Sequence, residues 1–210
     1  MKLIFYLILF VLSPIFLNSQ NITHIQIQNA ISPATATYLK DAFIQSKKNN
    51  SILMLIELDT PGGLSTSMRK MIQDILNSDI PVVVYVSPKG ARAASAGTYL
   101  AYASHISVMA PGTNIGAATP VNLMPVPKPP SKPPNVKEEK NKKVEKTAME
   151  KKVINDAVAY ITSIAQLRNR NIQWAVQAVK EGKSISALDA LEKNVIDLMA
   201  NDVSDLLEKI

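Results

Sequence analysis

A serine surrounded by small residues is the first feature of the chain that could carry out chemistry. Ser95 lies in the segment Gly90–Tyr99, which follows the apolar run Pro81–Val86 and precedes a segment, Gly97–Ser104, that can form a helix. This pattern places Ser95 where a buried strand turns into a helix, and the N–H groups of the first helical turn can bind negative charge beside it. The combination suits an acyl-transfer nucleophile. The same residues also suit a tightly packed turn in which Ser95 only caps the helix.

A second turn that could contribute to a site follows another buried strand. Ile52–Leu58 is a nearly continuous apolar run, typical of a central parallel strand, and it ends in Asp59–Gly63. The two glycines allow a sharp turn that exposes N–H groups before the helix expected over Leu64–Asn77. The segment lacks the Gly-Lys-Ser/Thr ending of a nucleotide-binding loop. It is therefore either a small anion-binding concavity or an ordinary Pro-Gly turn.

The loop Ala110–Ala117 follows the next strand expected, Ser104–Met109, and α/β proteins place ligand-binding groups at such strand ends. We expect it to form one lip of the site, with the glycine turn opposite. The substrate groove predicted in this way is lined by Gly62, Leu64, Gly112, Thr113, Asn114, Ile115 and Gly116.

Histidine and cysteine contribute little to the predicted site. The chain has no cysteine, which excludes disulfides and thiolate ligands, and two histidines are too few for most zinc or haem sites, so we expect no metal and no cofactor. His24 falls on the polar side of an alternating strand, Ile22–Gln28, and should be solvated. His105 follows the helix after Ser95 to its far end, so we do not expect it to be the base.

Composition and charge place most of the chain in a globular class. The chain has 210 residues, of which 47% are hydrophobic, and a net charge of +6. Lys128–Lys152 alone contributes +5, so the remainder is nearly neutral and offers no basic face for nucleic acid. Residues 119–151 are rich in proline and lysine and should form a solvated excursion, although a lid or a membrane tether is also possible.

The N-terminus has the layout of a secretory signal peptide. One positive charge precedes the apolar stretch Leu3–Leu17, which is short for a membrane span, and Leu17–Ser19 is a tolerable cleavage region. We predict that residues 1–19 are removed and that a domain over 20–210 is exported. The alternative is that the N-terminal segment is retained as a membrane anchor. The expected location is the periplasm or the outer face of the cytoplasmic membrane.

Ordered structure is expected to return at Lys152. Lys152–Ala165 carries a helical stripe of apolar residues, and Lys152 lies off that stripe in the first turn, as an ordinary solvated lysine would. A helix containing Trp174, a short helix over Ser186–Leu191, a strand over Val195–Met199 and a terminal helix follow. Strands that alternate with helices predict an α/β fold with a parallel sheet core and a C-terminal helical segment.

Four motifs in sequence resemble the protease domain of the NfeD family. They are Glu57–Gly63, Gly90–Tyr99, Met109–Ala117 and Lys152–Asn155. These membrane-associated serine proteases are encoded beside stomatin-like proteins, and they are related more distantly to signal peptide peptidase A. The resemblance runs from Ile22 to the C-terminus and implies a Clp-protease/crotonase-like fold, a repeated ββα spiral. It is to the short form of the family, which lacks the later transmembrane helices and β-barrel domain.

The resemblance implies a serine-lysine dyad. Ser95 matches the nucleophile, Lys152 the general base, and the N–H groups of Gly63 and Ala96 the oxyanion hole. A lysine base must be neutral, which requires a partly desolvated site. Other lysines lie close to Lys152 in the sequence and compete for its role, namely Lys143, Lys146 and Lys151.

The family also implies the substrate and the partners. They are a polypeptide with apolar segments from membrane proteins, a possible stomatin-like partner, and a second copy of the chain in a homo-oligomer. Two other functions remain open. One is a peptide-binding assembly factor without catalysis; the other is a crotonase-like acyl-CoA enzyme, which export from the cytosol disfavours.

Overall fold

The computed structural model describes residues 21–121 and 147–210. The predicted signal peptide and most of the excursion predicted over 119–151 lie outside these residues. Within them, no helix combines the length and the apolar character that crossing a membrane requires.

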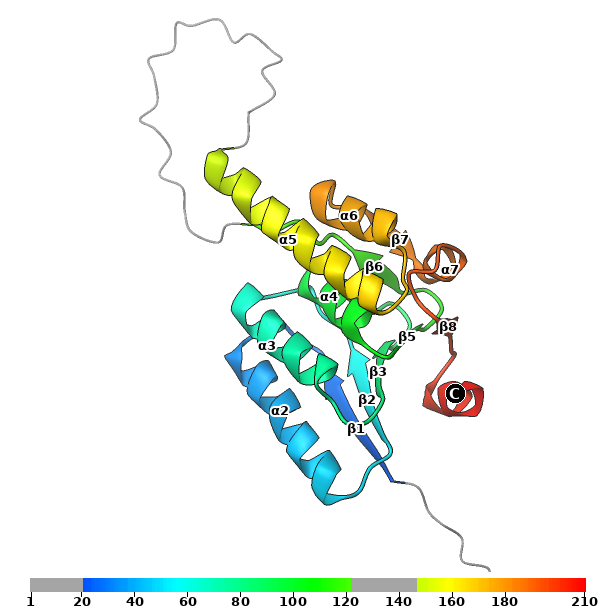
Figure 1. Cartoon of the computed structure of the whole chain (residues 1–210). Helices are drawn as coiled ribbons and strands as arrows, with labels where there is room; N and C mark the ends of the chain where they lie inside the picture. The colour runs from blue at the N-terminus through cyan, green and yellow to red at the C-terminus, as the bar shows by residue number, and fades with distance from the viewer. Residues whose placement is uncertain (1–20, 122–146) are drawn as a thin grey trace, which may run out of the picture.

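A parallel sheet of five strands forms the centre of the fold (Figure 1). Its order is β1-β2-β3-β5-β8, and every neighbouring pair is parallel. The strands are β1 (Ile22–Ile27), β2 (Leu53–Leu58), β3 (Val82–Val86), β5 (Ile106–Met109) and β8 (Leu198–Met199). β3 is buried throughout and β2 nearly so, as continuous apolar runs predict for strands covered on both faces.

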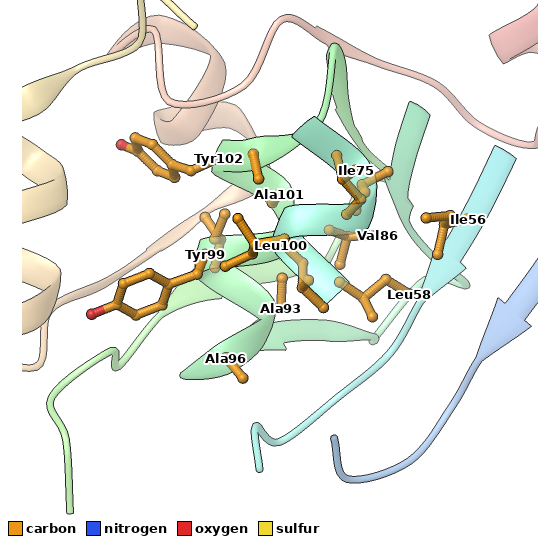
Figure 2. Close-up of a cluster of buried hydrophobic side chains, with 14 of the residues drawn as sticks. Ile56, Leu58, Ile75, Val86, Ala93, Ala96, Tyr99, Leu100, Ala101 and Tyr102 are labelled. Carbon is orange, nitrogen blue, oxygen red and sulfur yellow. The ribbon is translucent and has the colours of Figure 1, made fainter. Parts of the chain in front are cut away.

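Helices cover the two faces of this sheet unequally. On one face α2 (Pro33–Lys48), α3 (Ser65–Leu76) and α4 (Ala96–Ala103) pack over the larger core, part of which is shown in Figure 2. On the other face α8 (Val203–Lys209) buries Leu206 against a smaller cluster. The start of α2 is fixed by Ser32 and Thr35, which form a reciprocal capping box around Pro33.

A second, three-stranded sheet was not predicted. It consists of β4 (Arg92–Ala94), β6 (Asn114–Gly116) and β7 (Ser184–Ser186) in the order β4-β6-β7. Each strand has only three residues, too few to display an alternating pattern. β4 lies directly before Ser95 and β6 occupies part of the expected loop 110–117, so this sheet is what positions the serine.

The C-terminal part supplies α5 (Ala148–Leu167), α6 (Ile172–Lys180) and α7 (Ala187–Glu192). α5, yellow in Figure 1, lies beside α4 and α6. It begins at Ala148, four residues before the predicted start, because Thr147 and Glu150 form a capping box. The predicted α/β class with a parallel sheet core and C-terminal helices is confirmed.

Arg170 joins this C-terminal part to the sheet. Its buried guanidinium donates hydrogen bonds to the carbonyls of Tyr102 (2.8 Å) and Ser104 (2.9 Å), and it is ion-paired with Asp197. Asp197 also accepts the N–H of Ser107 in β5. Arg170 therefore links the C-terminal end of α4 to the segment before α6, where it lies itself, and to the segment before β8.

Replacing Arg170 should be costly because it removes the donor to two buried carbonyls and the charged partner of Asp197. We expect Arg170→Met to lower the free energy of unfolding by about 3–5 kcal/mol. Lys70→Met, which removes an exposed charge on α3, should change it by less than about 0.5 kcal/mol. Urea unfolding of both variants measures the difference, and equal stabilities would contradict the assigned role.

His105 should make stability depend on pH. Its Nδ1 accepts the N–H of Val82 (3.2 Å), and burial, together with the charges of Arg168 and Arg170, lowers the pKa of the imidazole. The folded protein therefore disfavours the protonated ring, so stability is present above the unfolded-state pKa of about 6.5 and falls as pH drops through the folded-state value. In urea unfolding, His105→Gln should have a smaller loss of stability below about pH 6.5 than the wild type. An identical pH dependence would refute this.

Candidate active site

Ser95 has an unusual backbone conformation and an unengaged hydroxyl. Its φ of 53° and ψ of −114° are rarely adopted by residues other than glycine. It stands at the N-cap position of α4, but its side chain makes no capping hydrogen bond, and its Oγ has no hydrogen-bond partner among the described residues. The alternative role as a helix cap therefore has no support in the geometry.

Neighbouring backbone groups hold Ser95 in this conformation. Its N–H donates to the carbonyl of Gly116 (2.9 Å), and its carbonyl accepts the N–H of Thr98 (3.0 Å). The hydroxyl oxygen of Thr98 lies within hydrogen-bond distance of the carbonyls of Ala93 (2.9 Å) and Gly116 (2.8 Å), which share its one proton, and it so connects β4 to β6. Thr98 lies in the motif that the sequence singled out, but its role as a bracket between two strands was not predicted.

The glycine turn approaches Ser95 closely. Gly62 has a φ of 113°, and a Cβ built on it would lie 2.5 Å from the Cβ of Ser95. No other residue type fits there without displacing the serine. The close approach of Ser95 therefore explains why the turn after β2 has a glycine at position 62.

Two backbone N–H groups are available beside the serine. Gly63 forms a parallel bridge with Ile31, in which Ile31 donates to Gly62 (2.7 Å) and Leu64 donates to Ile31 (2.8 Å). The N–H of Gly63 itself donates to none of the described residues. Ala96 is the first residue of α4, so its N–H has no partner inside the helix.

Ser95 opens into a cavity of about 490 Å³. The cavity collects residues from the glycine turn, α3, α4, the segment after β6 and α5, and its walls are mainly apolar. The side chains that define it include Leu64, Met68, Tyr99, Val121, Val153 and Tyr160. An extended polypeptide with apolar side chains is the kind of ligand that fits such walls.

Lys152 lies next to this cavity but does not line it. It is exposed near the start of α5, whereas the following residue, Val153, lines the cavity together with Asp156, Ala157 and Tyr160. These four have the spacing of one helix face. The structure therefore places Lys152 next in sequence to a residue that lines the Ser95 cavity, with its own side chain exposed.

The residues predicted to line the groove divide between two places. Gly62 and Leu64 line the Ser95 cavity. Three others, Gly112, Thr113 and Asn114, line a separate cavity with Gly90 and Asp189. Ile115 and Gly116 are buried in β6, whose two sides pair with β4 and β7, so their backbone groups serve the sheet.

Four side chains at the cavity were missed by sequence reasoning: Arg69, Tyr99, Asp156 and Tyr160. The tyrosine rings stack with centroids 6.1 Å apart, and Figure 2 shows Tyr99 directed away from the sheet side chains Ile56 and Leu58. Burial raises the pKa of Tyr99 well above its usual range. On α5 the available signal was the spacing of Val153, Asp156 and Tyr160, because the side-chain contacts of Arg69 with this helix cannot be read from sequence.

The two histidines lie elsewhere. His105 contacts Val82 and Arg168, and neither histidine lines the Ser95 cavity. His24 was predicted to be solvated, and its Nε2 lies 2.6 Å from Oε1 of Glu57. Burial of Glu57 opposes ionisation, but hydrogen bonds from Ser87, Gln26 and His24 lower the pKa of this carboxyl below its ordinary value.

Comparison with known proteins identifies sequence relatives. The family described as NfeD1b, N-terminal domain, matches residues 21–125. The chain is 36% identical over 208 residues to the membrane-bound protease PH1510 of Pyrococcus horikoshii, covering 96% of this chain and 42% of that protein. It is 33% identical over 103 residues to the membrane protein NfeD1b of Bacillus subtilis, covering 49% and 23%. The chain thus spans less than half the length of these curated relatives.

Solved structures similar to this one carry the name 1510-N. A serine-to-alanine mutant of 1510-N, a membrane-bound stomatin-specific protease, has a TM-score of 0.78 at 34% identity, covering 92% of this chain and 86% of that one. A lysine-to-alanine mutant in complex with a substrate peptide has a TM-score of 0.77 at 34% identity, with coverages of 92% and 81%. The fold expected from the resemblance is thus confirmed as the fold of these proteins.

Two substitutions separate the energetic cost of the contact between residue 62 and Ser95 from the cost of a positive φ. Gly62→Ala should destabilise the fold because the added Cβ meets Ser95 and because φ is positive. Gly90 also has a positive φ, 90°, but a Cβ there would meet nothing within 4 Å. We expect Gly90→Ala to cost about 1–2 kcal/mol and Gly62→Ala about 1–3 kcal/mol more, measured by urea unfolding. Equal costs would show that the contact with Ser95 has no energetic weight.

Proposed function

The chain belongs to the NfeD1b family, and we propose that it is a serine endopeptidase in which Ser95 is the nucleophile and Lys152 the general base. The observation that carries the proposal is the unengaged hydroxyl of Ser95, in a strained conformation at an apolar cavity. The existence of serine and lysine mutants of a similar protease supports these two residue types.

In the proposed reaction the neutral amine of Lys152 takes the proton of the Ser95 hydroxyl while Oγ attacks the carbonyl carbon of a peptide bond. The N–H groups of Gly63 and Ala96 would stabilise the resulting oxyanion, with a contribution of about 3 kcal/mol per donor. The lysine then gives its proton to the leaving amine as the C–N bond breaks. A water molecule, deprotonated by the same lysine, hydrolyses the acyl-enzyme and regenerates Ser95.

The position of Lys152 sets a requirement for this mechanism. A proton acceptor must carry a free lone pair and be within hydrogen-bond reach of the hydroxyl. A polypeptide that fills the cavity would displace water between α5 and Ser95, which favours the neutral amine. We therefore place the approach of Lys152 to Ser95 in the substrate complex.

We further propose that the substrate is an apolar segment of a membrane-associated protein. The apolar walls of the cavity support this, and the similar solved proteins are named as stomatin-specific proteases. A stomatin-like protein is accordingly the proposed partner, and the proposed location is the outer side of the cytoplasmic membrane. We also propose that residues 20–210 form a single domain and that this domain assembles into a homo-oligomer.

Cleavage of a fluorogenic apolar peptide tests the dyad. We expect Ser95→Ala and Lys152→Ala to lower kcat/KM by about 10³-fold or more, because each removes a group that forms or breaks a bond. Lys151→Ala is the matched control, since it removes the neighbouring exposed lysine of the same helix. Its kcat/KM should remain within about twofold of the wild type.

Three results would change the assignment. Undiminished cleavage by Ser95→Ala would exclude it as the nucleophile. Loss of cleavage in Lys151→Ala but not in Lys152→Ala would transfer the role of base to Lys151. Binding of the peptide with no product from the wild type would favour the non-catalytic peptide-binding function.

A further inference from the structure

The first half of α5 carries Lys152 and contains no fully buried residue. The buried residues of this helix are Ile161, Ile164 and Ala165, all in its second half. Residues 148–153 are exposed throughout. Nearer to Lys152 the helix packs against the core through the partly buried Ala157, Val158 and Tyr160, so contacts at this turn set the position of the turn that bears the lysine.

Side chains from two other helices meet α5 within one turn, Asp156–Tyr160. Arg69 of α3 donates from Nη2 to Oδ2 of Asp156 (2.5 Å), and its guanidinium carbon lies 4.1 Å from the centre of the Tyr160 ring. Tyr99 of α4 stacks on Tyr160 and donates its hydroxyl to the carbonyl of Ala157 (3.4 Å). A planar cation, a carboxylate and two rings thus converge between the core-packed half of α5 and Lys152.

We propose that Arg69, Tyr99, Asp156 and Tyr160 form a clamp on α5 that positions Lys152 for proton transfer with Ser95. The inference rests on the proposed function, since it assigns a role to residues that touch neither of the proposed reacting groups. Asp156 lies one helical turn after Lys152, so any rotation of α5 at the clamp moves the lysine directly. All four residues also line the Ser95 cavity, so the clamp and the substrate share one space.

The aromatic part should contribute more than the ion pair. Asp156 is largely exposed and Arg69 partly so, and exposed pairs are screened by water. The face of Tyr160, by contrast, contacts Arg69 and the ring of Tyr99, and such contacts do not require a hydroxyl. The hydroxyl of Tyr160 makes no hydrogen bond to the described residues, so phenylalanine at this position should preserve the clamp.

Kinetics with the apolar peptide separate positioning from substrate binding. Arg69→Met and Tyr160→Leu should lower kcat by about tenfold or more while KM stays within about twofold, because the lysine is misplaced in the bound complex. Tyr160→Phe should restore kcat to within about twofold of the wild type. Lys47→Met, which breaks the exposed Lys47–Asp79 pair remote from this cavity, is the control and should leave both constants unchanged.

A rise in KM without a change in kcat would overturn the positioning role. If that rise were confined to peptides with an acidic side chain, Arg69 would instead be a binding residue for a substrate carboxylate. A kcat for Tyr160→Phe as low as that for Tyr160→Leu would also contradict the proposal.

Hydrogen exchange tests the clamp without reference to catalysis. In Arg69→Met and Tyr160→Leu, the amides of residues 148–160 should exchange at least about threefold faster than in the wild type, whereas Tyr160→Phe and Lys47→Met should not differ. Residues 161–167 serve as an internal reference, because core packing holds them in every folded variant. Unchanged exchange in 148–160 would overturn the clamp.

The two experiments fail in distinguishable ways. If the wild type does not cleave the peptide, the proposed function fails and exchange alone decides whether the clamp exists. If exchange accelerates but kcat is unchanged, the clamp exists and its role in positioning Lys152 is wrong.

Discussion

The close contact between the Gly62 backbone and Ser95 is the constraint on which the site depends. A serine with a φ of 53° is strained, and it persists only when its surroundings fix it from several directions. Gly62 restricts it from one side, while β6 accepts its N–H on another. Gly97 lets α4 begin against Thr60, where a Cβ would lie 2.6 Å from Cγ2 of that threonine. The small residues around Ser95 therefore serve the approach of three segments.

The second sheet explains how the constraint is met. β4 and β6 are short, but each end of β4 is tied to the glycine turn, because Thr60 donates to Arg92 and accepts from Ala94. On its other side the turn is bound to Ile31, which donates to Gly62 and accepts from Leu64. The segment Thr60–Leu64 is thus held between two partners, which would fix the N–H of Gly63 if it is a donor of the proposed oxyanion hole. Preorganised donors of this kind need no rearrangement when charge develops on a bound group.

The sequence was informative where the determinants are local. β2 and β3 could be predicted from continuous apolar runs, and the two glycine-containing segments of the site lie directly beside those strands. β4, β6 and β7 could not be predicted, because three-residue strands are defined by their partners rather than by their own pattern. The short strands are also the reason that only part of the predicted groove lies at Ser95. Gly112–Asn114 follows a strand end as expected, but β6 pairs with β7, and these residues line a separate cavity with Gly90 and Asp189. Arg69 and Tyr160 were out of reach because they meet only when α3 and α5 pack.

The placement of Lys152 has a physical reason if it is the base. A lysine buried permanently beside Ser95 would lose its hydration without a paired charge, which is costly for the folded state. An exposed lysine on a helix half that has no buried residue avoids that cost before substrate binds. The dyad would then depend on contacts that orient the Lys152 side chain without burying its amine. Arg69, held between the carboxylate of Asp156 and the ring of Tyr160, provides such contacts at the margin of the cavity. The free energy needed to desolvate the lysine would come from the substrate that fills the apolar walls, so that a strong base forms only when a peptide bond is in place to be attacked.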